Sequence, residues 1–87
     1  MKIAAEFISV DRNEKYRMGD NNPWVIKCKW TDNNKNMEYY FISKDYTIDP
    51  TPYLKGRLHI DVFIDPADPG KYFMDTSFVP KGNNTIG

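Results

Sequence analysis

Apolar side chains recur at every second position of the segment WVIKCKW, residues 24–30. Trp24, Ile26, Cys28 and Trp30 occupy every second position, and lysines stand between the last three of them. Successive side chains of a β-strand point to opposite faces, so the alternation predicts a strand with one buried and one solvated face. No window of the chain sustains the i, i+3, i+4, i+7 apolar spacing of an amphipathic helix. The chain is therefore expected to be all-β.

Four other segments show the same period of two and are predicted as strands: residues 2–10, 37–43, 57–64 and 71–75. The polar run TDNNKN, residues 31–36, is typical of a hairpin turn. Besides residues 24–30, the side chains expected on one face of each strand are Ile3, Ala5, Phe7, Met37, Tyr39, Phe41, Leu58, Ile60, Val62 and Ile64.

Between the third and fourth predicted strands, the pairs Asp49-Pro50 and Thr51-Pro52 exclude a central strand, because proline lacks the backbone donor. This segment is expected to fold back onto the core through one 3₁₀ turn. The side chains expected to cover the core there are Tyr46, Ile48, Tyr53 and Leu54.

Five short strands with local connections favour antiparallel pairing, and a sheet of this size exposes its edges unless it curls. A small five-stranded antiparallel barrel or strongly bent sheet, of the OB or SH3-like kind, is the predicted architecture. A flat open sheet covered by two long loops is the alternative. At 87 residues the chain forms one domain, expected to span residues 1–80 and to leave residues 81–87 as a flexible C-terminal tail.

The acidic segment DPADPG, residues 65–70, is interpreted as a turn. Proline presets φ at the second position of a turn, and the preceding aspartate can accept a bond from the backbone N–H two residues on. Gly70 would supply a positive φ if the turn required one. A calcium loop or a carboxylate pair is the alternative, but the terminal glutamate of an EF-hand loop is missing.

Composition argues against several classes of function. Lysine and arginine number 12 against 12 aspartates and glutamates, whereas nucleic-acid binders usually carry a basic excess. The single cysteine, Cys28, excludes an intramolecular disulfide and a cysteine zinc cluster. The single histidine, His59, is expected on the opposite side of the sheet from Cys28. We therefore expect no catalytic residues, no cofactor and no metal, and the chain is not predicted to be an enzyme.

A candidate contact surface comes from exposed aromatic and basic residues. Lys27, Lys29 and Tyr40 are expected on the outer face of the 24–42 hairpin, with Lys35 and Lys44 nearby, and Tyr16 lies in the polar segment 11–22. Aromatics interleaved with basic residues on a barrel face can bind single-stranded nucleic acid. The alternative for this face is a solvated surface of cross-strand pairs between lysine and Glu38.

Three segments resemble a bacterial family of unknown function. PWVIKCKW, YYFISKDYTIDPTPYL and IDVFIDPADPGKYFMDTSFVP together resemble the soluble part of small membrane-associated proteins, over about residues 20–80. The resemblance implies a small β-barrel-like domain, often beside transmembrane helices, with no known enzymatic activity. The matching positions, all interpreted as structural, are Asp49, Pro50, Tyr53, Asp65, Pro66, Pro69, Tyr72, Asp75, Phe78 and Pro80.

The leading functional hypothesis is a non-enzymatic binding or accessory domain that contacts a protein partner, as the soluble part of a bacterial membrane-associated protein. An OB-like module for single-stranded nucleic acid is the alternative. No run approaches the roughly 18 apolar residues of a membrane span, so the chain as written is expected to be soluble. A membrane would be contacted only through segments absent from this chain, and the sequence does not fix the compartment.

Overall fold

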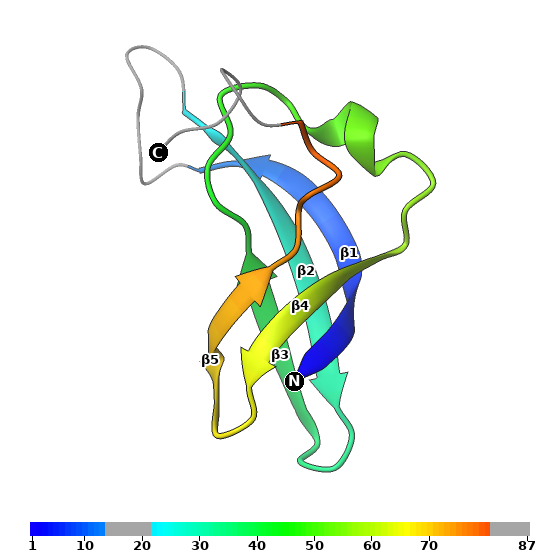
Figure 1. Cartoon of the computed structure of the whole chain (residues 1–87), viewed down its shortest axis with the longest axis vertical. Helices are drawn as coiled ribbons and strands as arrows, with labels where there is room; N and C mark the ends of the chain where they lie inside the picture. Colours follow the sequence, from blue (N-terminus) through cyan, green and yellow to red (C-terminus); the bar gives the residue numbers. More distant parts are fainter. Residues whose placement is uncertain (14–21, 81–87) are drawn as a thin grey trace.

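The computed structural model describes residues 1–13 and 22–80. Five strands follow one another along the chain: β1 (Lys2–Arg12), β2 (Trp24–Asp32), β3 (Met37–Ile42), β4 (His59–Asp65) and β5 (Asp68–Met74). One 3₁₀ turn, η1 (Thr51–Leu54), lies between β3 and β4 (Figure 1). No α-helix occurs in these two ranges, and the all-β prediction is confirmed.

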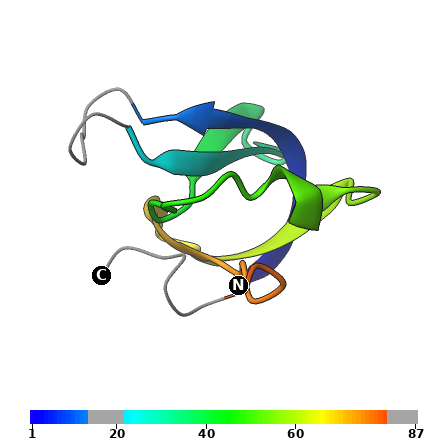
Figure 2. The ribbon, with the colours of Figure 1, turned by 90° about the horizontal axis from the view of Figure 1, so that it is seen from above.

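All five strands belong to one antiparallel sheet with the order β3-β2-β1-β4-β5. The sheet curls strongly, so that its two end strands, β3 and β5, approach each other on one side (Figure 2). The architecture is a half-barrel, which confirms the prediction of a strongly bent sheet. The alternative prediction, a flat open sheet covered by two long loops, is wrong.

A β-bulge helps β1 to bend. Phe7 lies opposite Cys28 and Ser9 lies opposite Lys27, which leaves Ile8 as an extra residue on β1. A bulge increases the local bend and twist of a strand. It also shifts the alternation by one residue, so that Val10, opposite Ile26, packs against the core.

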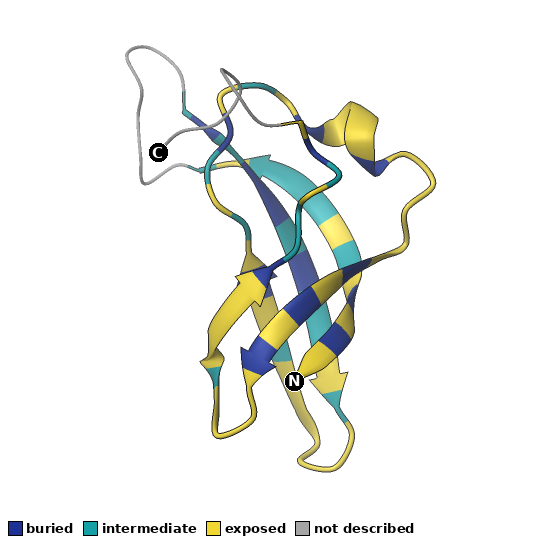
Figure 3. Ribbon diagram, in the orientation of Figure 1, coloured by how far each residue is buried: buried dark blue, intermediate teal, exposed yellow. Residues whose placement is uncertain are grey.

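Buried residues recur along the strands of the curled sheet (Figure 3), and their side chains form one hydrophobic cluster. Most of the side chains predicted to point inward from β1, β2, β3 and β4 are buried, and Trp30 is partly buried against them. The buried cluster is Ile3, Ala5, Ile26, Cys28, Phe41, Tyr46, Leu54, Ile60, Val62, Ile64, Met74 and Val79. Tyr46 and Leu54 fold back onto this core as predicted, and the 3₁₀ turn lies where it was expected.

Three side chains predicted to face the core are exposed instead. Leu58 is 74% exposed because β4 begins at His59, so Leu58 precedes the strand and its alternation. Tyr53 is 39% exposed because it lies in η1, where Leu54 is the buried residue. Met37 is 50% exposed at the first position of β3, next to the turn. These three predictions were therefore wrong.

Strand boundaries also differ from the prediction. β1 and β2 extend two residues further than expected, β3 stops one residue earlier, and β4 begins two residues later. β5 begins at Asp68 rather than Lys71, so that Pro69 lies inside a strand. β5 is an edge strand, where proline is tolerated because its missing N–H interrupts no central ladder.

The acidic segment forms the predicted turn only at Pro66 and Ala67, because Asp68, Pro69 and Gly70 already belong to β5. Asp65 accepts a hydrogen bond from the Ala67 amide at 2.9 Å, and Asp68 accepts one from the Gly70 amide at 3.2 Å. These are the local aspartate bonds that shape turns. The only glycine with positive φ in the described residues is Gly56, at 77°, so Gly70 is not needed for that purpose.

Candidate functional site

The seam of the half-barrel lies between β3 and β5, and a tyrosine side chain bridges it. The Tyr72 hydroxyl accepts a hydrogen bond from the Ile42 amide at 3.0 Å and donates one to the Ile42 carbonyl at 3.1 Å. Its ring meets Phe41 edge-on, with 4.8 Å between centroids. One hydroxyl thus bonds both the amide and the carbonyl of Ile42, as the backbone of a neighbouring strand would. Within the described residues, no backbone ladder joins β3 to β5.

A second tyrosine bridge crosses the same seam further along the chain. The buried Tyr46 donates its hydroxyl proton to the Thr76 hydroxyl at 2.6 Å. Burial raises the pKa of Tyr46, so this hydroxyl remains a donor through the neutral range. The Tyr46 backbone also exchanges two 2.9 Å hydrogen bonds with Trp24, which anchors the segment after β3 to β2.

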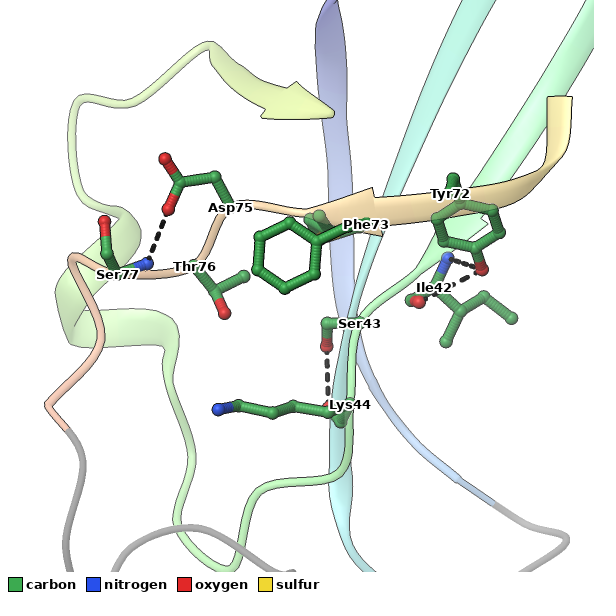
Figure 4. A pocket seen from close by; sticks show the side chains of 9 residues that line it. Ile42, Ser43, Lys44, Tyr72, Phe73, Asp75, Thr76 and Ser77 are labelled. Carbon is green, nitrogen blue, oxygen red and sulfur yellow. Dashed lines mark hydrogen bonds between the residues drawn. The ribbon is translucent and has the colours of Figure 1, made fainter. Parts of the chain in front are cut away.

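A cavity of about 290 Å³ lies along the seam, between Ile42–Lys44 on one side and Tyr72–Ser77 on the other (Figure 4). Ser43 donates its hydroxyl proton to the Lys44 carbonyl at 2.8 Å and accepts the Ile26 amide at 2.8 Å. Hydrogen bonds from Ser77 lower the pKa of the Asp75 carboxyl, so Asp75 is charged at neutral pH. The cavity therefore combines two strand edges with one lysine and one carboxylate.

Three of the four predicted contact residues lie together on the outer face of the hairpin. Lys29 is directly opposite Tyr40, and Lys27 is opposite Ile42. Tyr40 is 64% exposed and Ile42 is 48% exposed. We call Lys27, Lys29, Tyr40 and Ile42 the hairpin face. Tyr16, the fourth predicted residue, lies outside the described residues.

Carboxylates flank the lysines of the hairpin face. The Lys27 ammonium lies 3.7 Å from the Asp11 carboxylate. Lys29 has Glu6 opposite it on β1. The Tyr40 hydroxyl donates to Glu38 at 3.4 Å. The positive charge of this face is therefore largely compensated by neighbouring acids.

The two remaining lysines of the predicted basic patch do not join the hairpin face. Lys35 lies in the turn before β3, whereas Lys44 follows the other end of β3. The Lys44 ammonium lies 5.8 Å from the centroid of the Tyr46 ring, beside the seam cavity. The prediction that all the lysines gather near Tyr40 was wrong, because the length of β3 separates these two.

Cys28 and His59 lie on opposite faces of the sheet, as the alternation predicted. Cys28 is fully buried, and burial raises the pKa of its thiol to about 12. At neutral pH it is a small apolar core residue and not a nucleophile. His59 is exposed at the start of β4. Among residues 1–13 and 22–80, no three histidines, cysteines or carboxylates are grouped so as to hold a metal ion.

The second hollow, of about 350 Å³, lies where the β2–β3 and β4–β5 turns meet. Trp30, stacked on Tyr39 at 5.8 Å, forms part of its wall with Pro66 and Pro69. Its apolar lining continues the core towards solvent.

Comparison with known protein families, with curated proteins and with solved structures finds no significant match. The resemblance to the bacterial family stays a prediction. No helix within the described ranges is long and apolar enough to cross a membrane.

Sequence reasoning did not find the two tyrosine bridges of the seam. Tyr72 was one of ten motif positions and Tyr46 was one core residue among several. Their hydroxyl partners, Ile42 and Thr76, are each 30 residues away in the sequence, and no local pattern encodes such a contact.

Proposed function

We propose that this chain is a non-enzymatic binding domain that contacts a protein partner through the hairpin face. The observation that supports the proposal is the exposure of Tyr40 and Ile42 beside two half-buried lysines. Tyrosine provides a large amphipathic contact at low entropic cost and is enriched in protein interfaces. Barrels of the OB type bind oligonucleotides and oligosaccharides on the face of the second and third strands, so nucleic acid is the alternative ligand for this surface.

The charge pattern favours a protein partner over a polyphosphate. A nucleic-acid surface gains its affinity from uncompensated lysine and arginine. Here Asp11 pairs with Lys27, and Glu6 lies across from Lys29. A mixed-charge surface around an exposed aromatic suits a polypeptide of similarly mixed charge.

The resemblance to bacterial membrane-associated proteins extends the proposal. On this view the half-barrel is the soluble domain of such a protein. Only the sequence pattern supports this extension.

The hairpin face is tested by replacing Tyr40. The immobilised domain should capture a partner from detergent-solubilised bacterial extract, and Tyr40→Ala should reduce capture at least tenfold, as truncation of an interface tyrosine does. Leu58→Ala is the control, since Leu58 is 74% exposed, against 64% for Tyr40, and lies outside the face. A partner retained equally by wild type and Tyr40→Ala would contradict the proposal.

The nucleic-acid alternative is separated by fluorescence anisotropy with a labelled single-stranded oligonucleotide at low salt. We expect no binding. Binding that falls with added salt and is lost in Lys27→Ala and Lys29→Ala would show that the ligand of the hairpin face is nucleic acid and not a protein.

A further inference from the structure

The second hollow opens at one end of the half-barrel, where the β2–β3 and β4–β5 turns lie (Figure 1). We call this hollow, lined by Trp30, Pro66 and Pro69 among others, the mouth. Its volume is about 350 Å³. Ligand sites are often found in the mouths of β-barrels and measure about 300–1,000 Å³. The mouth is therefore large enough for part of a peptide or for a small molecule.

The walls of the mouth are mainly apolar rings. Trp30 comes from β2, Ile64 from β4, and Pro66 and Pro69 from the β4–β5 turn and the start of β5. The Trp30 ring is stacked on Tyr39, with 5.8 Å between the centroids and 22° between the planes, which restrains it. Rings held in place before binding lower the entropic cost of binding. A ligand in the mouth would thus contact one fixed indole ring and two pyrrolidine rings.

The polar groups of the mouth that lack a partner are mainly hydrogen-bond donors. Within residues 1–13 and 22–80, the Trp30 indole N–H and the Lys35 ammonium bond no acceptor. Asp32 already accepts the Asn34 amide at 3.0 Å, which commits one carboxylate oxygen to the turn. A complementary ligand is therefore apolar, rich in acceptors and poor in donors.

We propose that the mouth binds a proline-rich segment of a partner polypeptide in the polyproline II conformation. Proline has no backbone N–H, so such a segment brings carbonyl acceptors and few donors. Its carbonyls form no hydrogen bonds within the polyproline II helix, which leaves them free to accept from Trp30 and Lys35. Grooves lined by aromatic rings recognise proline-rich segments because this helix is already formed before binding.

Other ligands match the mouth less well. Every hydroxyl of a saccharide brings a donor, and Asp32 is the one carboxylate among the described residues of the lining. A small aromatic anion would be held by the exposed Lys35 alone, with Asp32 nearby opposing its charge. The donor excess and the proline and indole rings together favour the proline-rich peptide.

The mouth is separate from the hairpin face. Trp30 packs against the core, on the inner side of the β2–β3 hairpin. Tyr40 and Lys29 are directly opposite each other, and Tyr40 is exposed on the outer side. Tyr40→Ala should therefore leave peptide binding at the mouth unchanged, so this proposal can fail without affecting the proposed function of the hairpin face.

The test is an NMR titration of the nitrogen-labelled whole chain with synthetic oligoproline up to millimolar concentration. Trp24 and Trp30 are the two tryptophans of the chain, so the spectrum contains two indole N–H resonances, which Trp30→Phe assigns. We expect the Trp30 resonance to shift and to saturate, while that of Trp24, which does not line the mouth, stays in place. A glycine-serine peptide of equal length should shift neither resonance.

Affinities for a dye-labelled oligoproline, measured by fluorescence anisotropy, separate the contributions of the mouth. Trp30→Phe keeps an aromatic ring and removes the donor, so it should weaken binding about fivefold, as loss of one hydrogen bond implies. Lys35→Ala, at an exposed turn position, should also weaken binding without changing the fold. Tyr40→Ala should bind as wild type does.

Three results would overturn the proposal. The first is a Trp30 resonance that does not respond to millimolar oligoproline, or responds equally to the glycine-serine peptide. The second is an affinity that is unchanged in both Trp30→Phe and Lys35→Ala. The third is binding of benzoate or maltose without binding of oligoproline, which would make the mouth a small-molecule site.

Discussion

Replacing Tyr46 by alanine is expected to destabilise the domain by about 3–5 kcal/mol, the range measured for buried aromatic residues. Tyr46 is 1% exposed and is the largest fully buried side chain described. Its removal would leave a cavity under the segment after β3 and would leave the Thr76 hydroxyl without its donor. Domains of this kind are stable by only about 5–15 kcal/mol, so much of the stability would be lost.

Tyr46→Phe separates the ring from the hydroxyl. Phenylalanine keeps the buried ring and removes only the bond to Thr76, so we expect a loss of about 0.5–1.5 kcal/mol. Both variants are measured by urea unfolding followed by tryptophan fluorescence. Equal losses for the two variants, or a loss under about 1 kcal/mol for Tyr46→Ala, would contradict the packing described for this residue.

Ile60→Ala is expected to cost about 2–5 kcal/mol, because Ile60 is 1% exposed in the middle of the core. Leu58→Ala removes a side chain of similar size two residues away, at a position that is 74% exposed. Surface substitutions of this kind usually change stability by under about 0.5 kcal/mol. The pair tests where the alternation of β4 begins. A loss from Leu58→Ala as large as that from Ile60→Ala would show that the alternation already begins before His59.

Period-two alternation was sufficient to predict the strands and most of the core. It depends only on the geometry of the extended backbone, which is why Ile26, Cys28, Ile60 and Val62 are buried as expected. The hydrogen bonds that Asp65 and Asp68 accept were also predictable, because an aspartate and the backbone amide two residues on are neighbours in the sequence.

The errors have a different physical origin. Leu58 belongs to an apparent alternating run, but Gly56, with φ of 77°, and the turn around it delay the strand. Only one of the neighbouring residues Tyr53 and Leu54 can point inward from η1, and the sequence pattern does not show which one.

The closure of the seam depends on contacts distant in sequence. The Tyr72 and Tyr46 bridges exist only once β3 and β5 have been brought together by the curl of the sheet. The bulge at Ile8 contributes to that curl, and no residue type in the segment predicts a bulge there. The hairpin face was predictable because hairpin partners are close in sequence. The seam was not, because the strand order must be known before the two end strands can be identified.

The hydrogen bond from the Ile42 amide to the Tyr72 hydroxyl is the contact by which a side chain closes the seam of the half-barrel. Amide hydrogen exchange at Ile42, in wild type and in Tyr72→Phe, measures it most directly. We expect the Ile42 amide to be protected in wild type and to exchange about tenfold faster in Tyr72→Phe, as loss of a bond of about 1.4 kcal/mol implies. The Ser43 amide, bonded to the Ile26 carbonyl at 2.9 Å, should stay protected in both. An Ile42 amide that is unprotected in wild type, or equally protected in both proteins, would contradict a seam closed by this side chain.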